Sequence, residues 1–194
     1  ILGSVFKKNC FLRKLFYRWI YLLILRAWHV HKELKSWCSA ALSNFHNEDS
    51  FGNKGIPKIL DAGAGYGQYS FWLNRRVTHA EILAVDVKEE QVADCNNFFY
   101  VIGSSQHVKF VVDDLTKYKS ENTYDLVISV DVMEHILEDV QVFKNFYASL
   151  KPGGMLLVST PSDQGGSDVH GDDEASFIEE HVRDGYNMDD IKRK

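Results

Sequence analysis

The stretch KILDAGAGYGQYS, residues 58–70, joins a short apolar run to a glycine-rich turn. The apolar run is long enough for one buried parallel strand. Gly63, Gly65 and Gly67 alternate with other residues, and glycine turns sharply without placing a Cβ between the main chain and a ligand. A run with helical apolar spacing begins at Tyr69, and the start of a helix offers unpaired N–H groups. The stretch therefore predicts a strand, a turn that approaches a ligand, and a helix.

The glycine spacing bears on the kind of ligand. The dinucleotide fingerprint is G-x-G-x-x-G, with the pyrophosphate at the helix N-terminus. Here the spacing is G-x-G-x-G, and Asp61 stands just before the loop. From the loop alone, an unliganded turn and a nucleotide site both stay open as alternatives.

Length and composition favour one globular α/β domain with an appendage. The chain has 194 residues, of which 45% are hydrophobic and 25% charged. Its three cysteines show no C-x-x-C and no metal spacing, which favours free thiols in a reducing compartment and a cytoplasmic location. The net charge of −5 argues against a general nucleic-acid binder.

The N-terminal segment differs in charge from the rest of the chain. Residues 1–45 hold eight Lys or Arg and one acid, a balance of +7 that leaves −12 for the remainder. Apolar spacing predicts helix over 5–45, in two segments, followed by a polar linker over 46–57. The run from Trp19 to Leu25 is far too short to span a membrane. We predict a helical cap over 1–50 and a ligand-binding domain over 51–194.

The rest of the chain alternates strand and helix patterns. Further strands are expected at 80–87, 108–112, 123–130 and 155–159, with helices at 88–102, at 137–150 and from about Met188. This alternation predicts a doubly wound, Rossmann-like, mostly parallel sheet. A sharp turn is expected at 151–154. On the helix at 137–150 the predicted apolar side consists of Val140, Phe143, Phe146, Tyr147 and Leu150.

Acidic residues stand at several predicted strand ends. Asp86 ends the second strand about 20 residues after the loop, where a carboxylate can accept hydrogen bonds from both ribose hydroxyls of a nucleoside. Capping of the following helix is the alternative role for Asp86. Asp113 and Asp114 follow the third strand, and Glu134 follows the fourth. Ligands of such sheets bind outside the carboxyl ends of the strands, so these residues predict one site.

In combination and order, these motifs resemble those of class I S-adenosylmethionine (SAM)-dependent methyltransferases. The resemblance covers about residues 56–160 and is closest to the ubiquinone/menaquinone-biosynthesis type. It rests on D-x-G-x-G-x-G at the loop and on the segments LDAGAGYG, AVDV, VVDDL, YDLVISVDVMEHI and LKPGGMLLVSTP. Such enzymes close their sheet with two further strands, so the resemblance implies a native polypeptide that extends past Lys194 and carries a β-hairpin.

The resemblance implies a role for each matching residue. Asp61 would face the SAM ammonium, Asp86 the ribose, and Asp114 the adenine amino group, with Asp113 as the competing choice. The cofactor-binding set is Asp61, Ala62, Gly63, Gly65, Gly67, Asp86, Val87, Asp113, Asp114, Leu115, Ser129, Val130 and Glu134. Candidate catalytic residues are His135 near the acceptor, and His170 and His181 in the acidic segment after the fifth strand. For each histidine a structural or surface role is the alternative.

The implied reaction is methyl transfer to a small-molecule, apolar or lipid-like acceptor. SAM is a cation without pyrophosphate, and the acidic strand ends suit it better than a phosphate ligand. A nicotinamide-dependent oxidoreductase and a non-catalytic SAM-binding module are the alternatives. No metal is expected.

The N-terminal helices have two predicted roles. As a roof over the acceptor cavity they would bring Trp28, His29 and His31 to the acceptor. A chain without residues 1–45 would then still bind SAM but no longer turn over its acceptor. Their basic and aromatic residues also suit peripheral contact with an anionic membrane. The roof is the favoured reading, because the apolar residues spread around much of the helix.

Overall fold

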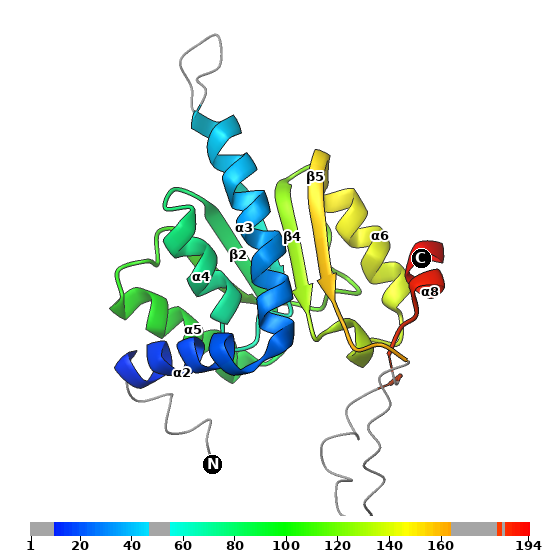
Figure 1. Cartoon of the computed structure of the whole chain (residues 1–194), viewed down its shortest axis with the longest axis horizontal. Coiled ribbons are helices and arrows are strands. Elements are labelled where there is room, and N and C mark those ends of the chain that lie inside the picture. Colours follow the sequence, from blue (N-terminus) through cyan, green and yellow to red (C-terminus); the bar gives the residue numbers. More distant parts are fainter. Residues whose placement is uncertain (1–9, 47–54, 164–181, 184) are drawn as a thin grey trace, which may run out of the picture.

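Five parallel strands form the centre of the molecule (Figure 1). The structure is a computed structural model that describes residues 10–46, 55–163, 182–183 and 185–194. The strand order is β3-β2-β1-β4-β5, and every neighbouring pair is parallel. The strands are β1 (Lys58–Ala62), β2 (Glu81–Asp86), β3 (Val108–Val112), β4 (Tyr124–Val130) and β5 (Leu150–Ser159). The predicted Rossmann-like sheet is confirmed, and its order reverses between β1 and β4, where such sheets bind ligands.

Helices cover both faces of this sheet. The helices are α2 (Cys10–Leu23), α3 (Leu25–His46), α4 (Gln68–Arg76), α5 (Glu89–Val101), α6 (Asp139–Ser149) and α8 (Met188–Arg193), with a 3₁₀ turn, η1, at Met133–His135. One buried cluster joins the sheet to α2, α3, α4 and α5, for example through Leu34, Leu73 and Phe99. The other joins the opposite face to α6 and the C-terminal segment through Phe146 and Tyr186.

Over the described residues, the N-terminal segment forms two helices, as predicted. α2 and α3 are separate helices that meet at Ile24, and both contribute buried residues to the core. Residues 1–9 and most of the predicted linker lie outside the described residues. Among the described helices, none combines the length and the apolar character needed to cross a membrane.

The start of β5 differs from the prediction. Residues 151–154 were expected to form a turn before the strand, but β5 begins at Leu150, and its register with β4 shifts between Tyr124 and Leu126. Gly153 has φ +80°, and a Cβ on Gly154 would lie 2.9 Å from the Lys151 carbonyl oxygen. The predicted bend therefore exists, but it is an irregularity inside the strand.

The buried side of α6 was predicted in part, since Phe146 is buried and Phe143 and Leu150 pack against the same core cluster. Val140 and Tyr147 are instead 41% and 83% exposed, and Val142 is buried beside Asn145. Two stripes of apolar residues run along this helix, and spacing alone does not choose between them. The Asn145 amide donates to the carbonyl oxygens of Leu115 and Thr116, which allows a polar residue to be buried on the chosen side.

Candidate cofactor and active site

A cavity of about 570 Å³ lies at the carboxyl ends of the central strands. It is formed by the glycine loop after β1, the turn after β2, the turn after β3 and the loop after β4. The lining residues are Gly63, Gly65, Asp86, Val87, Lys88, Gln91, Asp113, Asp114, Leu115, Asp131, Val132, His135 and Ile136. Eight of the predicted site residues therefore lie in one cavity, although they come from four separate segments.

The glycine loop is held by backbone hydrogen bonds. The N–H groups of Gly63 and Ala64 both donate to the Val85 carbonyl oxygen, at 2.8 and 2.9 Å. Gly63, Gly65 and Gly67 have φ between +51° and +79°. A Cβ on Gly63 would lie 2.3 Å from Val132 Cγ2, whereas a Cβ on Gly65 would meet nothing within 4 Å. Gly65 thus presents open backbone to the cavity, which is the space a close ligand needs.

Asp86 connects this loop to the end of β2. Its Oδ2 accepts from the Gly65 N–H at 2.8 Å, and its Oδ1 accepts from the Lys88 N–H at 3.0 Å. These bonds orient the carboxylate and leave further lone pairs on both oxygens. The alternative role as a helix cap does not match the geometry, because α5 begins at Glu89 with Lys88 as its cap residue.

The acidic pair after β3 has two different environments. Asp114 Oδ1 accepts from the N–H and the hydroxyl of Thr116, at 2.9 and 2.7 Å, and these hydrogen bonds lower the pKa of Asp114. Asp113 is exposed and accepts from the Asp114 N–H at 2.7 Å. Both side chains line the cavity, so the choice between them as the adenine partner stays a prediction.

Asp61 does not line the cavity. It is buried, and its Oδ2 accepts from the N–H and the hydroxyl of Ser70 in α4, at 3.1 and 2.6 Å. Burial raises the pKa of Asp61 to about 6. In this structure the carboxylate supports the start of α4 behind the glycine loop.

Other predicted residues also lie behind the cavity wall. Ala62, Ser129 and Glu134 are buried, and the Glu134 carboxylate accepts from the Thr160 hydroxyl at 3.1 Å. A Cβ on Gly67 would meet the Phe110 ring at 2.7 Å, so Gly67 serves packing. Asp61, Ala62, Gly67, Ser129, Val130 and Glu134 are absent from the lining. Their assigned roles in binding SAM stay predictions.

Of the three candidate catalytic histidines, the structure places one. His135 lines the cavity with an exposed side chain at the end of η1. His170 and His181 lie outside the described residues. Sequence reasoning missed Lys88, Gln91, Asp131, Val132 and Ile136, although they lie between a predicted strand and the first turn of the next predicted helix. Asp131 was the most visible of these, since it follows β4 as Asp86 ends β2.

The N-terminal helices contact the rim and the loop of the site. Arg26, which lies in α3, forms an ion pair with Asp131 at the cavity wall. Arg13 of α2 is buried, and its guanidinium donates to the Tyr66 carbonyl oxygen at 2.8 Å and to the Asp94 carboxylate at 2.6 Å. The Tyr17 hydroxyl donates to the same Tyr66 carbonyl. Because Tyr66 lies between Gly65 and Gly67, α2 holds the outer side of the glycine loop.

Trp28 and His31 of α3, which were predicted to contact the acceptor, lie outside the cavity lining. His31 is buried against Tyr69 and Trp72, and its Nδ1 lies 2.6 Å from the Ala27 carbonyl oxygen. Burial lowers the pKa of His31. Trp28 is 53% exposed, and neither residue lines the 570 Å³ cavity. A role of these side chains in holding the acceptor remains a prediction.

The chemistry of the cavity fits SAM. Its charged lining comprises four carboxylates and one lysine, a balance that attracts a cationic ligand and repels a pyrophosphate. Gly65 offers open backbone, and Asp86 is oriented at the end of β2 for the ribose hydroxyls. When bound, SAM supplies an activated methyl group.

The comparison with protein families agrees with this site. Residues 59–154 match the family model described as a methyltransferase domain. Residues 59–154 are thus similar to a methyltransferase domain, in agreement with the fit of the cavity to SAM. The nicotinamide alternative receives no support from this match.

Named relatives are methyltransferases of two kinds. The chain is 32% identical over 152 residues to phosphoethanolamine N-methyltransferase 1 of Triticum aestivum, across 74% of this chain and 28% of that protein. It is 28% identical over 134 residues to malonyl-[acyl-carrier protein] O-methyltransferase 2 of Ilyobacter polytropus, across 66% of this chain and 51% of that protein. The chain thus spans about a quarter and about half of these relatives.

Solved structures share the fold. Phosphoethanolamine N-methyltransferase 2 of Haemonchus contortus, in complex with SAM, matches with a TM-score of 0.60 and 22% identity. The match covers 81% of this chain and 35% of that chain. At this identity the similarity concerns the fold alone.

Proposed function

We propose that this protein transfers the methyl group of SAM to a small-molecule acceptor. The observation that carries the proposal is the cavity at the sheet switch point, with Gly65 open and Asp86 oriented within a methyltransferase domain. In such a reaction the protein mainly aligns the acceptor and excludes water, and alignment supplies roughly 7–11 kcal/mol of the barrier reduction. His135 is the candidate base for acceptors that must lose a proton.

The second part of the proposal concerns the chemical identity of the methyl acceptor. The named relatives include phosphoethanolamine and malonyl-[acyl-carrier protein] methyltransferases, which makes both compounds the first to test here. The sequence resemblance adds quinone-type and other lipid-like acceptors of the ubiquinone/menaquinone-biosynthesis group. We also propose a cytoplasmic protein that contacts membranes through α2, because apolar side chains of this helix are exposed.

Binding and turnover are tested separately. Calorimetry should detect SAM binding and no NADH binding, and Asp86→Ala should weaken SAM by about 1.5–3 kcal/mol, the value of hydrogen bonds to a charged group. Glu121→Gln, an exposed change remote from the cavity lining, is the control. Equal SAM affinity in all three proteins would contradict the site.

Labelled methyl transfer then identifies the acceptor. Phosphoethanolamine, malonyl-[acyl-carrier protein] and a quinone precursor are offered with methyl-labelled SAM, and label is expected in one acceptor class. A chain that binds SAM but transfers label to none of them would favour the non-catalytic SAM-binding module.

A further inference from the structure

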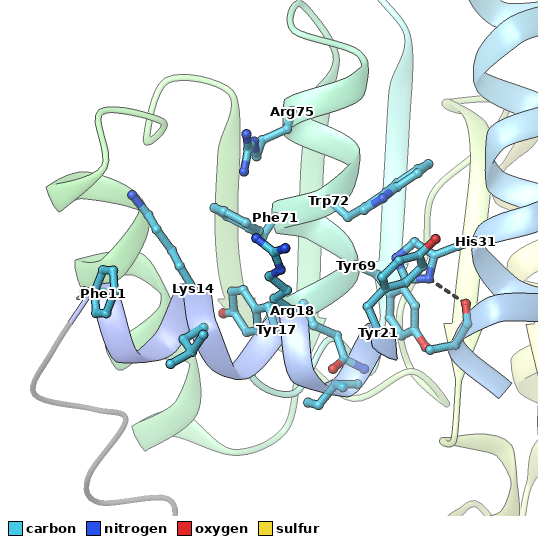
Figure 2. A pocket seen from close by; sticks show the side chains of 14 residues that line it. Phe11, Lys14, Tyr17, Arg18, Tyr21, His31, Tyr69, Phe71, Trp72 and Arg75 are labelled. Atoms are coloured by element: carbon cyan, nitrogen blue, oxygen red, sulfur yellow. Dashed lines mark hydrogen bonds between the residues drawn. The ribbon is translucent and has the colours of Figure 1, made fainter. Parts of the chain in front are cut away.

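A second cavity, of about 460 Å³, lies between α2 and α4, apart from the SAM cavity. Figure 2 shows its 14 lining side chains. Its walls include the aromatic rings of Tyr21, Phe71 and Trp72, and none of the lining residues is acidic. The cavity therefore combines apolar walls with an unbalanced positive charge.

Three cations provide that charge. Lys14 and Arg18 come from α2 and Arg75 comes from α4, and Figure 2 shows Arg18 and Arg75 near Phe71 from opposite helices. The Arg75 guanidinium lies 5.6 Å from the centre of the Phe71 ring. All three side chains are exposed, and within the described part of the chain none of them pairs with a carboxylate. Like charges that line one cavity without acidic partners favour an anionic ligand there.

The outer side of α2 continues this surface with apolar residues. Phe11, Leu15, Trp19 and Leu22 are 72%, 40%, 56% and 54% exposed. Their spacing places them on the side of α2 away from the buried Arg13. A contiguous exposed apolar surface marks an interaction site, and a basic border beside it suits the interface of an anionic membrane.

We propose that Lys14, Arg18 and Arg75 bind the phosphate headgroup of an anionic phospholipid, while the exposed apolar residues of α2 enter the membrane interface. The inference rests on the membrane contact proposed above and names its binding site. A soluble organic phosphate would satisfy the cations but leave Phe11 and Trp19 in water. A second copy of the chain would place the basic N-terminal helices, with their balance of +7, against each other.

Vesicle flotation of the intact protein tests the site. Vesicles of phosphatidylcholine alone are compared with vesicles that also contain phosphatidylglycerol, and binding is expected to the second kind only. The triple variant Lys14→Gln, Arg18→Gln, Arg75→Gln should weaken partitioning about a hundredfold, since each cation near an anionic surface contributes about fivefold. The control, Lys109→Gln, Lys119→Gln, Lys144→Gln, makes the same charge change on exposed residues outside the cavity.

The outcomes separate the alternatives. Equal losses in the two triple variants would overturn the headgroup site, because only total charge would then matter. Tight calorimetric binding of glycerol 3-phosphate that the first triple variant abolishes would overturn the membrane lipid in favour of a soluble ligand. A dimer in sedimentation velocity that the same variant dissolves would instead assign the surface to a second copy. SAM affinity, measured on every variant, should not change. Flotation therefore tests the headgroup site, whereas SAM binding and methyl transfer test the proposed function separately.

Discussion

Gly65 leaves space in the cavity because it has no side chain. Its φ is +51°, and a Cβ there would point into free space at the cavity. Gly103 is a matched position, with φ +72° and free space around a Cβ, but it lies at the end of α5 outside the cavity lining. The two residues therefore share a left-handed backbone conformation and differ in their access to the cavity.

This pair makes a controlled prediction. Gly65→Val and Gly103→Val should each lower the free energy of unfolding by about 1–2 kcal/mol, because a non-glycine residue in the left-handed region is strained. Only Gly65→Val should abolish SAM binding in calorimetry, since its side chain would occupy the ligand's space. Retained SAM binding in Gly65→Val would show that the loop does not contact the cofactor.

The buried carboxylate of Asp61 predicts a pH effect on stability. Burial raises the pKa of Asp61 from 3.8 to about 6. The protonated carboxyl therefore contributes to the stability of the fold, fully below pH 3.8, and this contribution is lost as pH rises through about 6. The loss amounts to about 3 kcal/mol. Asp61→Asn keeps an acceptor for Ser70 without the charge. The unfolding free energy of the variant, relative to that of the wild type, should therefore rise by this amount between about pH 4 and pH 7. If denaturant unfolding gave the same difference in stability between variant and wild type at every pH in this range, the burial of a charged Asp61 would be contradicted.

At the scale of an element, α2 holds the glycine loop of the proposed SAM site. The Arg13 guanidinium bridges the Tyr66 carbonyl oxygen to Asp94 of α5, and it also donates to the Tyr17 hydroxyl at 2.7 Å. Tyr17, Val30 and Leu34 complete the core on this side. That a chain without residues 1–45 still binds SAM stays a prediction. The contacts of α2 favour weaker binding by such a chain, because the deletion would expose the core and release the loop.

A substitution tests α2 without deleting it. Arg13→Gln should lower the free energy of unfolding by about 3 kcal/mol, because it leaves the largely buried Asp94 without its charge partner. It should also weaken SAM binding at temperatures where the variant is folded, since the Tyr66 carbonyl loses a donor.

Two further variants separate loop positioning from stability. Arg13→Lys keeps the charge and should recover part of both effects, whereas Arg13→Gln with Asp94→Asn should recover stability but not SAM affinity. SAM affinity that is equal in wild type and folded Arg13→Gln would leave α2 with a structural role only.

At the scale of the whole molecule, a second buried ionic group holds the C-terminal segment. Asp139 of α6 is buried and accepts from the Tyr186 hydroxyl at 2.6 Å and from Arg183 and Lys194. Burial opposes the charge on Asp139, but the hydrogen bonds from Lys194 and Tyr186 and the charge of Arg183 hold its pKa below the ordinary value. This stabilising contribution is present at neutral pH and is lost as pH falls.

Asp139→Asn should therefore destabilise the molecule at neutral pH. Loss of the carboxylate leaves two cations without their partner, and the expected cost is about 3 kcal/mol in denaturant unfolding. The control is Asp190→Asn, which removes the exposed pair with Arg193 and should cost less than about 1 kcal/mol. Equal costs for the two variants would show that the buried network does not hold the C-terminal segment.

The sequence alone determined the order of strands and helices and the edge of the sheet that carries the site. β3 matches its prediction at both ends, and Gly63, Gly65, Asp86 and Asp114 all reach the cavity. These features are local, because apolar periodicity defines each element and parallel strands bring their carboxyl ends to one edge.

Only the tertiary structure decided which polar residues face the cavity and which faces of the helices are buried. Asp61 and Asp86 both stand at predicted strand ends, yet Asp61 is buried against Ser70, whereas Gly65 holds Asp86 at the cavity. Arg13 meets Asp94 across 81 residues, and α2 consequently turns its other, apolar side outward. Such contacts join residues far apart in the chain, and no local periodicity records them.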